Sequence, residues 1–276
     1  MKGWQNGYFE VQDAGSQIIT QSLEVKPGES ILDYCAGNGG KTCGLASAVL
    51  DTSRNIGGSH DDNCDEEQRS TFRHSKIVAH DVIDERLRQI KGSLKRVGFS
   101  ARVDESNDND TCYIAKNRHG DCECSIQMAT SSDLDAGIKW IASSFDAVLV
   151  DAPCSSTGVL RRRPSQRWDL TENAIYDELP QLQLEILEKA ASFVREGGRL
   201  VYSTCSLLKE ENECVARKFE QSPVGSSFER WDFFTTTGSD SLAEDEQSLR
   251  HTLSLLPSTD GSDGFFIARW KRARKP

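Results

Sequence analysis

The stretch Phe145-Asp-Ala-Val-Leu-Val-Asp-Ala-Pro-Cys-Ser-Ser-Thr-Gly-Val-Leu-Arg-Arg-Arg163 passes from an apolar run to reactive side chains within a few residues. Its apolar part, residues 147–150, contains β-branched side chains and is typical of a strand buried on both faces. Pro153 ends such a strand, because its ring fixes φ, and Cys154 follows on a polar loop. We expect Asp151 and Cys154 to lie at the carboxyl end of this strand, where open α/β sheets bind ligands.

A second stretch has the same shape. Arg199-Leu-Val-Tyr-Ser-Thr-Cys-Ser206 is an apolar strand that ends in a small polar turn carrying Cys205. One cysteine at such a place is more often a buried structural residue. Two cysteines at the ends of two strands favour paired roles, in which one attacks a substrate and the other assists.

A glycine-rich turn follows the first predicted strand, residues 30–34. It reads Cys35-Ala-Gly-Asn-Gly-Gly-Lys-Thr42 and opens a predicted apolar helix. Glycines let the backbone approach a ligand, and the N–H groups at a helix start favour anionic groups. The pattern is neither a Walker loop nor G-x-G-x-x-G. Asp33 ahead of the turn is typical of class I S-adenosylmethionine sites, and an ordinary tight turn is the alternative.

Acidic residues end two further predicted strands. Asp81 follows residues 76–80 and is suited to accept from ribose hydroxyls, as acidic residues do in dinucleotide folds. Asp133 follows residues 125–130 and is expected to approach the adenine of a nucleoside cofactor.

Strands and helices alternate along most of the chain. Amphipathic helices are predicted over residues 83–97 and from Pro180 to Gly197-Gly198, and antiparallel closing strands over residues 228–234 and 264–270. The alternation predicts an α/β fold with a doubly wound, mostly parallel sheet.

The net charge of −10 is concentrated in three acidic segments. We expect these segments to be disordered insertions in a single catalytic domain that spans residues 1–276. They are residues 52–75, 104–125 and 235–262. A zinc site formed by His60, Cys64 and His74 is the alternative for the first segment, and it is disfavoured because no close Cys-x-x-Cys pair is present.

The remaining composition limits the partners. No apolar run approaches the ~18 residues of a membrane span, and no secretory signal begins the chain. Nine scattered cysteines favour a reducing compartment. We therefore expect an intracellular, soluble monomer with no membrane or metal partner, located in the cytoplasm, or in a plastid or mitochondrion if a transit peptide has been removed.

A basic cluster follows the Cys154 loop. Arg161, Arg162, Arg163 and Arg167 fit a nucleic-acid phosphate backbone, and a solvated surface is the alternative.

Four motifs in this order resemble the Sun family of RNA cytosine-C5 methyltransferases, in particular its bacterial-type small-subunit ribosomal RNA enzymes and their organellar relatives. The motifs are Asp33-Tyr-Cys-Ala-Gly-Asn-Gly-Gly-Lys-Thr42, Asp151-Ala-Pro-Cys-Ser-Ser-Thr-Gly158, Tyr202-Ser-Thr-Cys-Ser206 with Glu211-Asn-Glu213, and Asp263-Gly-Phe-Phe-Ile-Ala268. The opening residues 7–13 match as well, so the resemblance covers the chain apart from the insertions.

The resemblance implies a class I, Rossmann-like methyltransferase that transfers a methyl group from S-adenosylmethionine to C5 of cytosine in RNA, with ribosomal RNA as the first candidate. It assigns Cys205 as the nucleophile that adds to C6 and Cys154 as the residue that helps to release product. Asp151 is a candidate to hold a proton at N3. The residues implied in cofactor binding are Cys35, Ala36, Gly37, Asn38, Gly39, Gly40, Lys41, Asp81, Asp133 and Asp151.

Two positions depart from the family pattern, which usually has proline at Asn38 and glycine at Ser156. Transfer RNA is an alternative substrate, and a non-catalytic RNA-binding assembly factor on the same fold is an alternative function. A DNA cytosine methyltransferase would use the Pro-Cys cysteine as its nucleophile, and the second cysteine motif argues against that class.

Overall fold

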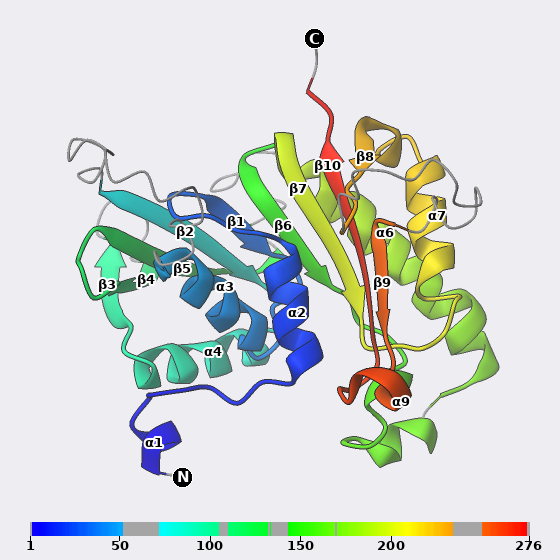
Figure 1. The fold of residues 1–276 in the computed structure, drawn as a ribbon, viewed down its shortest axis with the longest axis horizontal. Coiled ribbons are helices and arrows are strands. Elements are labelled where there is room, and N and C mark those ends of the chain that lie inside the picture. The colour runs from blue at the N-terminus through cyan, green and yellow to red at the C-terminus, as the bar shows by residue number, and fades with distance from the viewer. Residues whose placement is uncertain are drawn as a thin grey trace. The chain divides into compact units, whose positions relative to one another are not determined.

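The computed structural model describes residues 2–51, 72–104, 110–131, 133, 143–168, 170–233 and 250–274. The chain divides into two compact units (Figure 1). Unit 1 holds Met1–Val11 and Glu24–Lys139, and unit 2 holds Gln12–Leu23 and Trp140–Pro276.

Unit 1 is built on a mixed sheet with the strand order β3-β4-β5-β2-β1. Its strands are β1 (Ser30–Asp33), β2 (Arg73–His80), β3 (Ser100–Asp104), β4 (Asp110–Lys116) and β5 (Cys122–Ala129). Strands β1, β2 and β5 are parallel, and Ile77 lies opposite both Ile31 and Ile126. All three isoleucines are fully buried. Their burial explains why these short apolar runs form interior strands.

Helices α3 (Gly40–Leu50) and α4 (Asp84–Arg96) follow β1 and β2, and the short α1 (Lys2–Gln5) begins the chain. Helix α4 buries Leu87, Ile90 and Leu94 at helical spacing, each worth about 1.5–3 kcal/mol. Acidic side chains occupy its first turn and basic side chains its last, which suits the helix dipole. The prediction of an amphipathic helix over residues 83–97 is confirmed.

Unit 2 has β6 (Phe145–Asp151), β7 (Val194–Thr204), β8 (Phe228–Arg230), β9 (Thr252–Leu255) and β10 (Phe265–Arg272). Strands β6 and β7 are parallel, with Leu149 opposite Val201. Strand β10 runs antiparallel to β7, β8 and β9, so the predicted antiparallel closing strands are confirmed.

Helices α2 (Ala14–Ser22), α6 (Leu179–Ser192), α7 (Glu213–Gln221) and the short α9 (Pro257–Asp260) complete unit 2. Short helical turns also occur at Thr157–Val159, Pro164–Trp168, Ala174–Glu178 and Gly225–Ser227. Helix α6 connects β6 to β7, as expected for a parallel pair that needs a crossover. The predicted α/β class, with parallel strands joined through helices, is confirmed.

Helix α6 ends earlier than the sequence predicted. Its last residue is Ser192, and Gly197-Gly198 lie inside β7 instead of ending the helix. The register of β7 against β6 shifts here, because Phe145 pairs with Val194 and Ala147 with Arg199. Gly197 takes a φ of 71°, so the glycine pair forms a bulge in a strand.

The prediction of a disordered insertion over residues 104–125 is wrong for its described part. Strand β4 occupies residues 110–116, and β5 begins at Cys122. Tyr113 is buried and pairs with Ile126, so pairing with an interior strand stabilises a segment whose composition is acidic. Cys122 and Cys124 are buried strand residues.

The other two predicted insertions are also shorter than expected. Residues 73–75 belong to β2, residues 252–255 form β9 and residues 257–260 form α9. Strand β9 gains its hydrogen bonds from β10, which the local composition does not reveal. Residues 52–71, with His60 and Cys64, and residues 234–249 lie outside the described part of the chain. Among the described residues, no helix has the length and apolar character needed to span a bilayer.

Candidate active site

The two predicted cysteines lie in contact within unit 2. Cys205 follows the last residue of β7, and Cys154 comes three residues after the end of β6. Because β6 and β7 are parallel neighbours, their carboxyl ends meet at one edge of the sheet. The distance between the two Sγ atoms is 3.3 Å.

Backbone hydrogen bonds fix the two cysteine loops to each other. The Ala152 N–H donates to the Ser203 carbonyl, and the Gly158 N–H donates to the carbonyl of Cys205, both over 2.9 Å. A Cβ at Gly158 would lie 2.2 Å from the Gly264 carbonyl oxygen and 2.9 Å from that of Cys205. Glycine at this position therefore permits three chain segments to approach closely.

The contact with Cys205 changes the acidity of Cys154. The pKa of the Cys154 thiol lies well above its ordinary value because of its hydrogen bond with Cys205, its burial, and the negative charges of Cys205 and Glu211. The N–H of Ser156 opposes this shift. Two sulfurs this close disfavour two thiolates, so we expect Cys154 to be the protonated member of the pair.

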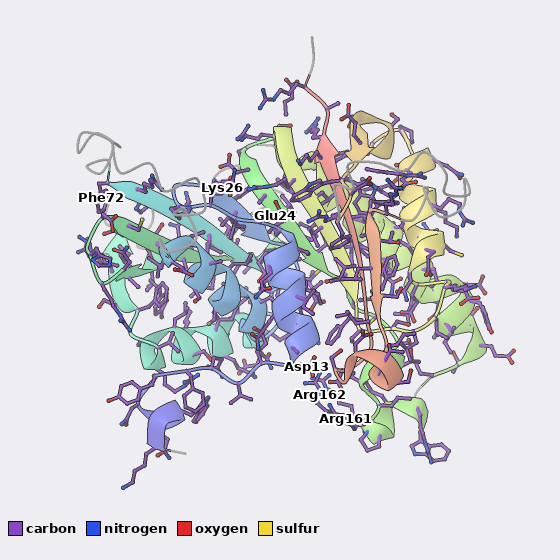
Figure 2. The ribbon with its side chains drawn as sticks, viewed as in Figure 1. Asp13, Glu24, Lys26, Phe72, Arg161 and Arg162 are labelled. Carbon is purple, nitrogen blue, oxygen red and sulfur yellow. The ribbon has the colours of Figure 1, made fainter. Side chains whose placement is uncertain are left out.

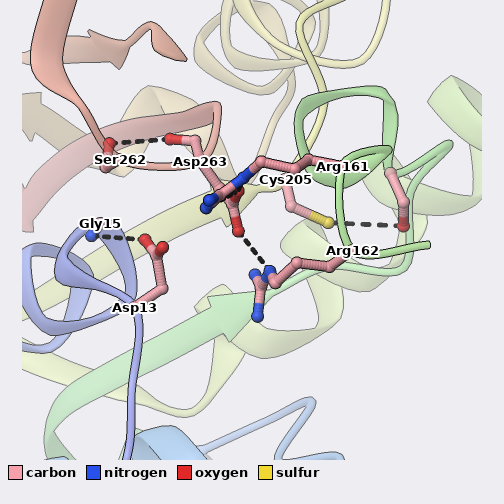
Figure 3. Close-up of polar contacts among 8 residues, drawn as sticks. Asp13, Gly15, Arg161, Arg162, Cys205, Ser262 and Asp263 are labelled. Carbon is pink, nitrogen blue, oxygen red and sulfur yellow. Dashed lines mark hydrogen bonds and ion pairs between the residues drawn. The ribbon is translucent and has the colours of Figure 1, made fainter. Parts of the chain in front are cut away.

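Ser156 lies on the other side of Cys205. The Cys205 thiol donates to Ser156 Oγ over 3.4 Å, the contact drawn to the Cys205 sulfur in Figure 3. Ser156 has a φ of 58°, the left-handed region that favours glycine. This geometry agrees with the glycine that the resembling family has there, and the serine adds a hydroxyl beside the sulfur.

Asp151 ends β6 at the same edge of the sheet as the cysteines. Its carboxylate accepts from Ser203 Oγ on β7 over 3.0 Å, and its side chain is partly exposed. Asp151 is therefore held in place by the neighbouring strand and remains accessible to a ligand.

The predicted basic cluster is partly bound to a buried acid. Arg161 and Arg162 both form ion pairs with Asp263, which is only 1% exposed, and the Arg161 Nη2–Oδ1 distance is 2.9 Å. Figure 3 shows these arginines beside Asp263, and Figures 2 and 3 both show them near Asp13 at the start of α2. Their side chains are still 72% and 51% exposed.

The other two arginines of the cluster are oriented differently. Arg163 is exposed, and the Arg167 guanidinium lies 4.2 Å from the ring centroid of Trp168. Trp168 is 75% exposed. An exposed aromatic ring beside an arginine suits a single-stranded nucleic acid. Trp168 follows the basic cluster directly in the sequence but belongs to none of the motifs quoted above.

The glycine-rich turn of unit 1 is organised by Asp81. One carboxylate oxygen of Asp81 accepts from the Gly37 N–H and the other from the Ile83 N–H, each over 2.9 Å. Asp81 is 4% exposed and lies at the end of β2, as predicted. Each carboxylate oxygen of Asp81 has a second lone pair that can accept another hydrogen bond. The contact of Asp81 with a ribose hydroxyl stays a prediction.

Two glycines of this turn differ in their surroundings. Gly39 has a φ of 83°, and a Cβ there would lie 2.8 Å from Ile90. Gly37 has a φ of 55°, and a Cβ there would meet no atom within 4 Å. The turn therefore packs on α4 at Gly39 and is open at Gly37. An open glycine turn at the start of α3 fits the carboxylate end of an S-adenosylmethionine molecule.

Buried side chains hold the glycine-rich turn against the neighbouring strands. Thr42 Oγ1 donates to Asp33 Oδ2 over 2.7 Å, which ties the start of α3 to β1. The His80 ring stacks on Tyr34 with centroids 4.6 Å apart. The N–H of Ala36 donates to the His80 carbonyl over 2.8 Å. Thr42 ends the glycine-rich motif and His80 precedes Asp81, but neither supporting role can be inferred from the local sequence.

Asp133 lies in a local turn. Its Oδ2 accepts from the N–H and the hydroxyl of Thr130, over 2.7 and 2.8 Å. This arrangement holds the chain just after β5, and the predicted contact with adenine stays a prediction.

A family model decides the relationship of the chain to known proteins. The model described as 16S rRNA methyltransferase RsmB/F matches residues 70–271. The chain belongs to this family. The RsmB/F family membership confirms the resemblance that the four motifs indicated.

Individual relatives agree with the RsmB/F assignment. The chain is 30% identical to ribosomal RNA small subunit methyltransferase B of Escherichia coli O6:K15:H31 over 269 residues, which cover 98% of this chain and 48% of the relative. The chain thus spans about half the length of the curated relatives it matches.

Solved structures show the same fold. The crystal structure of PH0851 is 28% identical, with a TM-score of 0.70, and the match covers 99% of this chain and 49% of that one. NSun6 from Pyrococcus horikoshii with SFG is 24% identical, with a TM-score of 0.67, and the match covers 100% and 56%.

Proposed function

We propose that this RsmB/F-family chain methylates C5 of cytosine in RNA, with ribosomal RNA as the substrate, through a covalent bond between Cys205 and C6 of the base. The contact between the Cys154 and Cys205 sulfur atoms at 3.3 Å is the observation that supports this most strongly. A cysteine with only a structural role does not need a second thiol in contact with it at the same edge of the sheet. The contact therefore favours a shared chemical role for the two cysteines.

The first chemical role belongs to Cys205. C5 of cytosine is a poor nucleophile, and addition of the Cys205 thiolate to C6 turns C5 into an enamine-like carbon. The Cys205 sulfur is 3.3 Å from the Cys154 sulfur and 3.4 Å from Ser156 Oγ, both of which can donate a hydrogen bond to a thiolate. These donors favour the thiolate at Cys205.

Asp151 and Cys154 act on the charge that this addition creates. Asp151 holds a proton at N3 while electrons move into the ring. S-adenosylmethionine, when bound, supplies the electrophilic methyl group that C5 takes. The C5 proton is then lost to water, and the C6–S bond breaks with its electron pair returning to Cys205. The Cys154 thiol donates a hydrogen bond to the departing sulfur and thereby assists release.

The cofactor and the RNA are assigned to different residues. Residues 35–41 and Asp81 bind the methionine and ribose parts of the cofactor, with Asp133 near adenine and Asp151 as a further contact. Arg161, Arg162, Arg163 and Arg167 bind phosphates that flank a target base, which must be unpaired or flipped out of a helix.

Transfer of labelled methyl groups tests the proposal. The protein is incubated with methyl-labelled S-adenosylmethionine and, separately, small-subunit ribosomal RNA, transfer RNA and DNA, and methylated cytosines are located by bisulfite sequencing. We expect incorporation into ribosomal RNA and none with Cys205→Ala. Incorporation into transfer RNA alone would replace the substrate, and incorporation into none of the three would refute the activity.

A further inference from the structure

A buried carboxylate outside the proposed mechanism connects the two cysteine loops. Glu211 lies in the turn between β7 and α7 and is fully buried. Its Oε2 accepts from the N–H of Ser155 over 2.8 Å, and its Oε1 accepts from the hydroxyl of Ser206 over 2.7 Å. Ser155 follows Cys154 and Ser206 follows Cys205, so one side chain binds the residue after each cysteine.

A second buried side chain extends this connection. Gln183 of α6 is fully buried and donates through Nε2 to Glu211 Oε2 over 2.8 Å and to the Pro153 carbonyl over 2.9 Å. The Tyr202 hydroxyl of β7 donates to the Glu211 carbonyl over 2.6 Å. The chain is thereby held on both sides of Cys154, at Pro153 and at Ser155.

The carboxylate is held by uncharged donors. Its hydrogen bonds come from a backbone amide, a hydroxyl and a side-chain amide. An ionised carboxylate is costly to bury, and such hydrogen bonds offset only part of that cost. A neutral glutamine of the same shape would avoid this cost, so the charge itself invites a functional explanation.

We propose that Glu211 is a positioning residue that binds the two cysteine loops to each other and keeps Cys154 as the protonated thiol of the pair. The proposal rests on the proposed function, because it assigns the thiolate to the nucleophile and the thiol to the residue that assists release. Loss of Glu211 would both loosen the contact between the sulfurs and allow negative charge at Cys154.

The groups around Cys154 agree with this role. The titratable groups that act on it are the Cys205 thiol at the end of β7 and the Glu211 carboxylate in the turn before α7. Its own loop contributes the Ser156 N–H, and α6 contributes the neutral Gln183, which binds the preceding Pro153. Of these groups, only the carboxylate can be made neutral without changing either sulfur.

The test is alkylation of the complete chain without RNA or cofactor, so that its outcome does not depend on methyl transfer. Iodoacetamide is added between pH 7 and pH 11.5, a range that extends well above the ordinary thiol pKa, and the Cys154 and Cys205 peptides are quantified by mass spectrometry. We expect Glu211→Gln to lower the pH at which Cys154 becomes half-reactive by about one unit. Glu210→Gln is the matched control, because Glu210 is the half-buried neighbour and does not act on Cys154.

An unchanged Cys154 midpoint in folded Glu211→Gln would overturn the proposal, and so would an equal shift in Glu210→Gln. If Glu211→Gln does not fold, Ser206→Ala gives a second test. That variant removes the hydrogen bond by which the carboxylate holds the Cys205 loop. The sulfur contact that raises the Cys154 pKa would loosen, so the Cys154 midpoint must fall, and no fall would overturn the proposal. If alkylation behaves as expected but no RNA is methylated, the proposed function fails while the role of Glu211 as a charge beside Cys154 stands.

Discussion

Gly158 is the point at which a single added methyl group should disturb both the fold and the candidate site. In Gly158→Ala the new Cβ would lie 2.2 Å from the Gly264 carbonyl oxygen and 2.9 Å from the Cys205 carbonyl oxygen. Both neighbours are backbone atoms, so they cannot turn away as the end of a flexible side chain can. The backbone at Gly264 and at Cys205 would have to shift.

The cost follows from two contributions. Overpacking costs about 1–3 kcal/mol. The shift also weakens two backbone hydrogen bonds of 2.9 Å, from the Gly158 N–H to Cys205 and from the Gly264 N–H to Gly158, each worth about 0.5–1.5 kcal/mol. We expect the free energy of unfolding to fall by about 2–6 kcal/mol, with the upper end reached if both hydrogen bonds are lost.

Urea unfolding followed by circular dichroism measures this change, and the rate of Cys205 alkylation reports on the site. Gly92→Ala is the control, because Gly92 lies inside α4 and a Cβ there meets nothing within 4 Å. The control should gain about 0.5–1 kcal/mol in helix stability. A Gly158→Ala variant within about 0.5 kcal/mol of the parent, with unchanged Cys205 alkylation, would show that the close approach at Gly158 does not limit the packing of the two cysteine loops.

Two further outcomes are expected, one for stability against pH and one for the cofactor. Burial raises the pKa of Glu220, but hydrogen bonds from His251, Arg230 and Trp270 outweigh it and lower the pKa to about 2. The resulting stabilisation is therefore present above the unfolded pKa of 4.5 and is lost as the pH falls towards 2. Solvent screens part of this interaction because Glu220 is only partly buried, so Glu220→Gln should cost about 1–2 kcal/mol at pH 7 and much less at pH 2.5 in urea unfolding. An equal cost at both pH values would contradict this. Asp81→Asn replaces one acceptor oxygen by an NH2 group, which cannot accept from the N–H of Gly37 or Ile83. Calorimetry should therefore show at least about tenfold weaker binding of S-adenosylmethionine. An unchanged Kd would count against Asp81 as a cofactor-binding residue.

The sequence predicted the parts of the site that depend on local pattern. The apolar runs before Asp151 and Cys205 predicted β6 and β7, and both strands place their cysteines at the same edge. Asp81 lies at the end of β2 as predicted. Strand ends and turns can be predicted from a single segment of sequence, because they depend mainly on residues that are neighbours in the chain.

The features that the sequence missed depend on distant segments. Glu211 belongs to the motif Glu211-Asn-Glu213, but nothing local to that motif indicates that its carboxylate is buried against the loops of Cys154 and Cys205. Arg161 and Arg162 were expected to be available to phosphate, and Asp263, 101 positions after Arg162, binds both. One signal was available for Gln183, a polar residue within the apolar face of a predicted helix.

Strand β4 was missed for a related reason. Its acidic surroundings in the sequence indicated an exposed insertion, whereas Tyr113 is buried against β5. Strand β4 lies between β3 and β5, which both supply its hydrogen bonds, so only part of one of its faces needs to be apolar. Composition averaged over 104–125 hides this pattern.

The measurement that tests the central claim most directly is the recovery of protein bound covalently to RNA. Cys154→Ala and Cys205→Ala are each mixed with S-adenosylmethionine and labelled ribosomal RNA, separated on a denaturing gel, and the adduct is mapped by mass spectrometry. We expect an adduct in Cys154→Ala, joined through Cys205 to a cytosine, and none in Cys205→Ala. An adduct found only in Cys205→Ala, joined through Cys154, would exchange the roles of the two sulfurs and contradict the account.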